Sequence, residues 1–183
     1  MKKQIMSVVN KSEGLKKKVY KKDGKTTQYG VCYEIHQKWL NSYGVYSAGE
    51  ITLAIKSIFD TEVFYNPMKI DQIKDINLAY NVYDMGYNSG KSTSIKLLQE
   101  CINVFLDEGK EIDVDGGIGK LTLAALNFVL KSKFKKSFVK TYIKFRKAKY
   151  IDILHEYRES KEHSDEHLMN CLESWNRRCR RIS

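Results

Sequence analysis

Apolar residues recur three and four positions apart through most of this 183-residue chain, which is the spacing of one face of an α-helix. One such stripe follows Ser47 and Glu50, which are spaced as a capping box, so we expect a helix to begin there. Further stripes predict helices at 76–83, at 95–105, from about 121, at 138–157 and at 168–179, with a polar loop at 159–167.

Residues 15–31 are the exception to this helical pattern. Asp23 and Gly24 stand between two segments that contain Val, Tyr and Thr, and an Asp-Gly pair in that setting is a strong signal for a β-hairpin. An amphipathic helical start precedes the hairpin and ends at Glu13. The fold class is therefore α+β, mainly α-helical, with a small β-hairpin after the first helix.

The chain is strongly basic, with 32 Lys and Arg against 22 Asp and Glu and a net charge of +10. Such a charge attracts nucleic acid, anionic lipid or an acidic cell wall. Residues 11–25 hold seven Lys against two acidic residues, and residues 131–150 hold no acidic residue. A basic helical protein that binds nucleic acid through 131–150 is therefore one alternative interpretation.

The start of the chain has two lysines but lacks the apolar stretch of a secretory signal, so we expect synthesis in the cytoplasm. No apolar run reaches the roughly 18 residues of a membrane helix, and we expect no stable membrane insertion.

The cysteines and histidines do not form a metal motif. The four cysteines include no Cys-x-x-Cys pair, and we expect Cys101 and Cys171, which fall on apolar stripes, to be buried. His163 and His167 are four residues apart but lack the acidic residue and third ligand of a zinc protease, so we expect a solvated loop. We expect no metal ion and no organic cofactor.

Two glycine-containing motifs favour structural roles. Gly90, followed by Lys and Ser, lacks the earlier glycine of a phosphate-binding loop and is interpreted as a helix start. Asp113, Asp115 and Gly116 lack the further ligands of a calcium loop. We interpret them as a tight turn before the helix that begins near Leu121.

Glu13 is the candidate general acid. A carboxyl group between a helix and a hairpin can face a cleft while apolar neighbours raise its pKa, which suits proton donation near neutral pH. Thr26, Thr27 and Gln28, on the returning strand, are placed to hold a water molecule or the substrate.

These residues resemble the signature of glycoside hydrolase family 108, in which Glu-Gly-Gly is followed by Asp-Pro-Gly-Gly-x-Thr-Asn-x-Gly-Ile. Here the pattern is Glu13-Gly14, Asp23-Gly24 and residues 27–31, with Leu15 in place of the second glycine and Gln28 in place of Asn. Residues 64–67, 85–90 and 96–99 are similar to later steps of the family. Residues 113–122, with Trp175 and Arg177, resemble the peptidoglycan-binding segment that follows the catalytic half.

The resemblance implies a lysozyme-like fold with a glycoside hydrolase catalytic half at 1–86 and a helical peptidoglycan-binding half at 87–183, packed into one compact unit. It implies a muramidase that cleaves the β-1,4 bond between N-acetylmuramic acid and N-acetylglucosamine. The implied site is a set of three catalytic and three substrate-binding residues: Glu13, Asp23 and Thr27, with Gln28, Tyr29 and Asn88.

The resemblance also implies a partner and a setting. Peptidoglycan is the substrate, and a holin or a secretion-system pore would release the enzyme to the periplasm or cell wall, for phage-type host lysis or secretion-associated wall remodelling. We expect a monomer that binds no nucleic acid. A cell-wall-binding module without activity is the second alternative.

Overall fold

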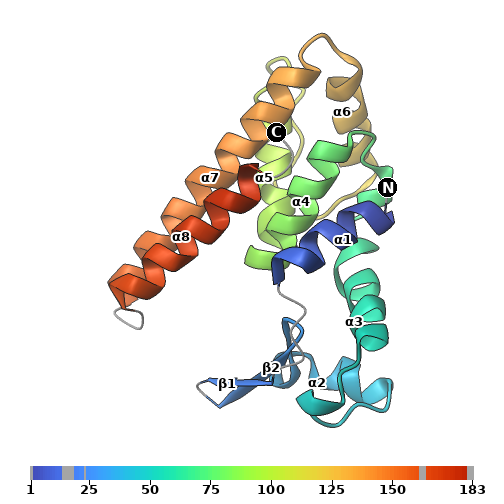
Figure 1. Ribbon diagram of the computed structural model, residues 1–183. Coiled ribbons are helices and arrows are strands. Elements are labelled where there is room, and N and C mark those ends of the chain that lie inside the picture. Colours follow the sequence, from blue (N-terminus) through green and yellow to red (C-terminus); the bar gives the residue numbers. More distant parts are fainter. Residues whose placement is uncertain (1, 14–18, 23, 161–163, 181–183) are drawn as a thin grey trace. The chain divides into compact units, whose positions relative to one another are not determined.

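A computed structural model describes residues 2–13, 19–22, 24–160 and 164–180. Contacts within the chain divide it into two compact units, Met1–Asn66 and Pro67–Ser183, shown in Figure 1. This boundary is a division by contacts, whereas the boundary predicted after residue 86 separates two functions. The functional division stays a prediction.

The first unit combines helices with a small antiparallel sheet whose strand order is β1-β2-β3. Its elements are α1 (Lys2–Glu13), β1 (Tyr20–Lys22), β2 (Lys25–Gln28), β3 (Val31–Cys32), α2 (Tyr33–Ser42), the 3₁₀ turn η1 (Ala48–Glu50), α3 (Leu53–Phe59) and the π-helical turn η2 (Asp60–Tyr65). Lys22 lies opposite Lys25, and Gly24 has a φ of +72°. The hairpin predicted after the first helix is therefore confirmed, and β3 extends it to a third strand.

Two features of this unit differ from the sequence prediction. The capping pair Ser47 and Glu50 closes η1 rather than α3, since the Glu50 carboxylate accepts hydrogen bonds from the Tyr46 amide at 2.8 Å and the Ser47 hydroxyl at 3.0 Å. The helix begins later, at Leu53, where Thr52 accepts a hydrogen bond from the Ile55 amide at 3.2 Å. The predicted start at Ser47 was wrong because a second cap follows directly.

Helix α2 was not predicted at all. Leu40 is its fully buried side chain, and Tyr33 and Trp39 pack partly buried against the same core, whereas Ile35 is 62% exposed. The core of the first unit forms around that leucine from buried residues of several elements: Tyr29, Val31, Leu40, Val45, Ala48, Ile51 and Phe59.

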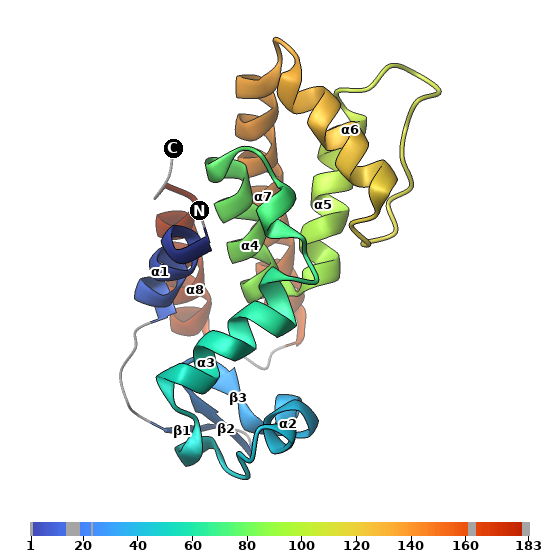
Figure 2. The same ribbon diagram turned by 90° about the vertical axis from the view of Figure 1, so that its right-hand side faces the viewer.

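The second unit is helical in its described residues. Its elements are the 3₁₀ turn η3 (Ile70–Gln72), α4 (Ile76–Ser89), α5 (Lys91–Asn103), α6 (Lys120–Lys131), α7 (Lys135–Ser160) and α8 (Asp165–Arg180). Figure 2 shows α4, α5 and α7 side by side, and these helices contact one another. The five helices predicted after residue 75 are all present.

The last helical pair corrects three details. Because α7 continues to Ser160 and α8 begins at Asp165, the polar loop is shorter than predicted. His167 therefore lies in a helix, while His163 lies outside the described residues. Cys101 is buried, as predicted, and this burial raises the pKa of its thiol to about 12. The prediction that Cys171 is buried was wrong, because its side chain is only half-buried.

A buried ionic cluster joins three helices of the second unit. The Asp84 carboxylate, on α4, accepts hydrogen bonds from Arg146 on α7 and from Arg178 on α8, the latter at 3.0 Å. Arg146 also donates to Asn81 at 2.8 Å and to the Tyr150 hydroxyl at 2.9 Å. The exposed fraction is zero for Asp84 and Arg146 and 7% for Arg178, so these charges depend on one another rather than on water.

None of the helices among the described residues combines the length and the apolar character needed to cross a membrane.

Candidate active site

Two of the three predicted catalytic residues fall in described parts of the chain. Glu13 is the last residue of α1. Thr27 lies in β2, is half-buried, and is paired with Tyr20 on one side and Cys32 on the other. Asp23 lies outside the described residues. In chain order, the candidate acid Glu13 ends a helix, and a three-stranded sheet follows. The middle strand of that sheet contains Thr27, whose hydroxyl can orient a water molecule.

Gln28 has a structural contact. Its side chain is 3% exposed, and its amide nitrogen donates to the Ile51 carbonyl oxygen at 2.6 Å. This bond fastens β2 to the segment before α3, which holds Thr27 in place from its neighbouring position. The predicted role of Gln28 in substrate binding stays a prediction.

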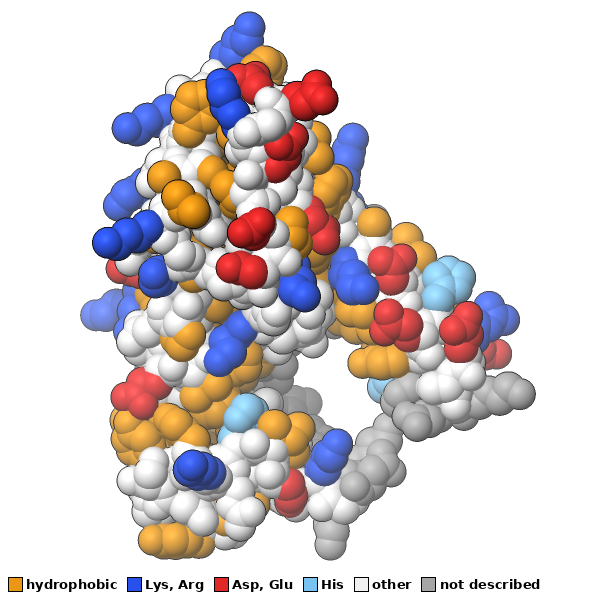
Figure 3. Space-filling view, turned by 180° about the vertical axis from the view of Figure 1, so that it is seen from behind, with side chains coloured by type: hydrophobic (Ala, Val, Ile, Leu, Met, Phe, Trp, Pro, Cys, Tyr) orange, Lys and Arg blue, Asp and Glu red, His pale blue; other side chains and the backbone are white. Residues whose placement is uncertain are grey.

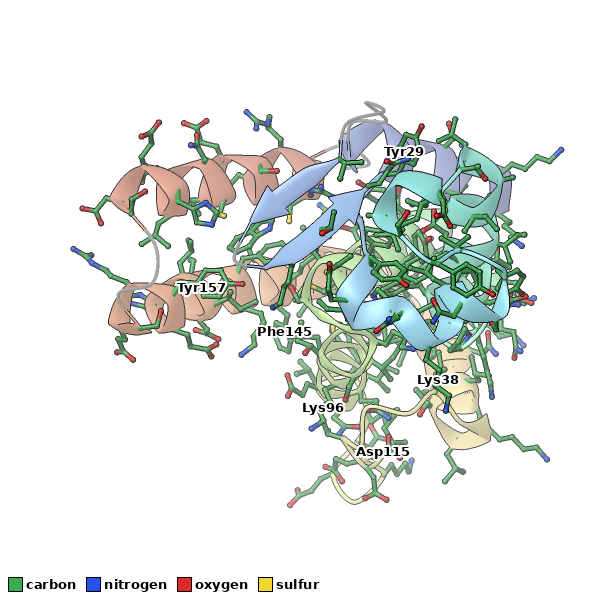
Figure 4. All side chains as sticks on the ribbon, turned by 90° about the horizontal axis from the view of Figure 1, so that it is seen from below. Tyr29, Lys38, Lys96, Asp115, Phe145 and Tyr157 are labelled. Atoms are coloured by element: carbon green, nitrogen blue, oxygen red, sulfur yellow. The ribbon has the colours of Figure 1, made fainter. Side chains whose placement is uncertain are left out.

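Tyr29 and Gly30 form the turn between β2 and β3. Gln28 pairs with Val31, so the turn has two residues, and their φ angles are +51° and +79°. Positive φ at both positions is typical of a type I′ hairpin turn, which explains the glycine in this motif. The Tyr29 side chain belongs to the core of the first unit, at 9% exposure; its position is labelled in Figure 4.

Asn88 lies on α4, in the second unit, and is half-buried. Its side-chain amide donates to the Asp84 carbonyl oxygen at 2.6 Å, one turn earlier. Gly90, two residues later, has a φ of +90° and starts α5, as predicted for this motif. The Asp, Asn and Gly of this segment thus each have a structural task, and substrate binding by Asn88 stays a prediction.

Glu34 is a residue of this region that the sequence analysis missed. Its exposed carboxylate accepts a hydrogen bond from the Thr26 amide at 2.7 Å and one from the Cys32 thiol at 3.4 Å. The bond from the Thr26 amide is the main reason that the pKa of Glu34 is lowered to about 2. A fixed negative charge therefore lies beside the strand that carries Thr27. An acidic residue in the first turn of a helix is favourable, so Glu34 could have been recognised from the sequence if α2 had been predicted.

The predicted turn before α6 is confirmed and is organised by Gln99. The Gln99 side chain donates to Asp115 at 2.7 Å and to the Gly117 carbonyl at 2.9 Å, and it accepts from the Gly116 amide at 2.9 Å. The bond from Gln99 is the largest cause that lowers the pKa of Asp115. Gly116 has a φ of +80°. In the parts of the chain that the structure describes, no three His, Cys, Asp or Glu side chains gather as a metal site requires.

Comparison with known structures supports a lysozyme-like fold. The solved structure of SagA from Brucella abortus matches with a TM-score of 0.64 over 98% of each chain, at 17% sequence identity, a likeness that concerns the fold alone. Curated proteins gave no match. The chain thus has a lysozyme-like α+β fold.

The first part of the chain matches a known protein family. Residues 6–90, just under half of the chain, match the family model Glycosyl hydrolase 108. The protein is accordingly a glycoside hydrolase of the muramidase type, and its substrate is peptidoglycan.

Proposed function

We propose that Glu13 is the general acid with which this muramidase cleaves the β-1,4 bond between N-acetylmuramic acid and N-acetylglucosamine. The observation that carries the proposal is the position of Glu13, at the end of α1 and before the sheet in chain order, within the segment that matches the hydrolase family. In this role Glu13 protonates the glycosidic oxygen as the bond to the sugar breaks.

A second group acts on the opposite face of the sugar. We assign this task to Asp23, as a base for water or as a negative charge that stabilises the oxocarbenium-like transition state. Thr27 orients the attacking water through its hydroxyl. The support for Thr27 is its position in the middle strand, where both neighbouring strands and the buried Gln28 anchor fix the backbone.

Residues 87–183 supply affinity for the wall in this proposal, and the enzyme acts as a monomer. A holin or a secretion-system pore releases it from the cytoplasm, either for phage-type lysis or for wall remodelling beside a secretion system. The support is the positive charge, which suits an anionic wall. On the face shown in Figure 3, Lys and Arg side chains are interspersed with acidic and hydrophobic ones.

Substitution of Glu13 by Gln tests the proposal. The amide preserves the shape of the side chain but cannot donate the proton, so clearing of purified peptidoglycan should slow by roughly 10²–10⁴-fold. Glu108→Gln is the matched control, because it makes the same change at an exposed position of the second unit. Sedimentation with intact walls should persist in both variants, and circular dichroism checks that both are folded. A folded Glu13→Gln protein that clears walls at the wild-type rate would refute the assignment.

A further inference from the structure

An open groove runs between α5 and α7 in the second unit, beyond the residues that match the hydrolase family. Its volume is about 450 Å³, and Leu97, Phe145 and Ala148 form its apolar part. Leu97 is buried and Phe145 half-buried, so the aromatic ring offers contact area to a ligand without leaving the helix packing. Figure 4 labels Phe145 on α7 and Lys96 on α5.

Both walls of the groove carry one positive and one negative side chain. Helix α5 contributes Lys96 and Glu100, and α7 contributes Lys149 and Asp152. The Lys149 ammonium is 4.0 Å from the Asp152 carboxylate and 3.9 Å from the Glu156 carboxylate, both farther than a direct hydrogen bond, and these side chains are 33%, 62% and 66% exposed. A ligand can therefore engage these charges without first breaking a tight ion pair.

We infer that this groove binds a short zwitterionic peptide. Its carboxylate would pair with Lys96 or Lys149, its amine with Glu100 or Asp152, and its aliphatic part would cover Phe145. A polyanion such as nucleic acid would meet the two acidic side chains, and a polycation would meet the two lysines, so neither is complementary to the whole groove.

The inference rests on the proposed function in one respect, namely the source of the ligand. The glycan strands of peptidoglycan carry short peptides that hold free carboxylates together with a free amine. A site for such a peptide in the second unit would let the enzyme hold the strand at a point other than the bond that it cleaves.

The first experiment measures binding to the full chain by isothermal titration. The probe is a synthetic tripeptide that ends in a diamino acid with a free side-chain amine and a free carboxylate. Two control peptides are identical except that one is acetylated on the amine and the other is amidated on the carboxyl group. Each control should bind about tenfold or more weakly, since each lacks one charged hydrogen bond.

The second experiment exchanges the two charges on α5. The double variant Lys96→Glu with Glu100→Lys keeps the net charge, and Glu before Lys four residues apart is favourable in a helix, so the fold should persist. The matched control is Glu173→Arg with Arg177→Glu on α8, an exposed pair with the same spacing, in which both side chains are 65% exposed. The exchange on α5 should lower peptide affinity about tenfold, and the exchange on α8 should leave it unchanged.

Three results would overturn the inference: no binding of the free tripeptide, equal binding of all three peptides, or unchanged affinity after the exchange on α5. Peptidoglycan clearing is measured separately. Peptide binding by a protein that does not clear walls would support the groove and refute the hydrolase mechanism, and clearing without peptide binding would do the reverse.

Discussion

Replacement of Asp84 by Asn should be among the most destabilising single changes in the second unit. Asparagine has nearly the same shape but no charge, so the buried Arg146 guanidinium would lose its carboxylate partner and Arg178 would lose its ionic contact with this position. Asp84 and Arg146 are fully buried, and the Arg178 side chain is 8% exposed, so water cannot replace the lost partner. Breaking a buried ion pair by removal of one partner costs about 3–5 kcal/mol. That is a large share of the 5–15 kcal/mol by which proteins are typically stable.

The assay is unfolding in urea followed by circular dichroism, with Asp107→Asn as the matched control. Asp107 also pairs with a cation, Lys110, at 2.8 Å, but the two side chains are 77% and 69% exposed. Solvent screens this pair, so its loss should leave the unfolding midpoint almost unchanged. If both variants unfold at the same urea concentration as the wild-type chain, the buried cluster contributes no net stability and the reasoning is wrong.

Two further predictions concern backbone strain and pH. A Cβ added at Gly116 would lie 2.3 Å from the Ser92 hydroxyl oxygen, whereas a Cβ added at Gly109, which has a similar φ of +79°, would meet nothing within 4 Å. In thermal unfolding, Gly109→Ala should therefore lower the stability by about 1 kcal/mol, and Gly116→Ala should lower it by clearly more. Because the pKa of Glu34 is about 2 when folded and near 4.3 when unfolded, its contribution is present above about pH 4.3 and disappears as the pH falls towards 2. Glu34→Gln should therefore weaken the loss of stability over that acidic range, and equal acid dependence in both proteins would contradict the bond to Thr26.

The sequence was informative where local rules decide the structure. The Asp-Gly pair predicted the β1–β2 hairpin, because its turn needs a residue that tolerates positive φ, and Gly24 has that conformation. The apolar stripes predicted the helices of the second unit, because each stripe is buried against a neighbouring helix. Asp115 was recognised as a turn residue for a similar local reason.

Features that depend on distant partners escaped prediction. The face that α2 packs on the core combines the buried Leu40 with the partly buried aromatic rings of Tyr33 and Trp39, and this helix was missed. Glu34 could not be placed without that helix. The sequence suggested Gln28 as a polar group for the substrate, yet its amide contacts Ile51, 23 residues away, a pairing that no local spacing reveals. The ionic cluster of Asp84 was not predicted either, because its partners Arg146 and Arg178 lie far along the chain.

The arginines that surround Asp84 limit how this chain can be recombined with its relatives. The acidic partner lies inside the segment recognised as a hydrolase, at 6–90, whereas both basic partners lie beyond it. A chimera joined after residue 90 would receive the carboxylate from one parent and would need both guanidinium groups from the other, at matching places on two helices. Exchange of segments should therefore succeed between parents that share this triad and fail between parents that differ in it, even where their catalytic residues are identical.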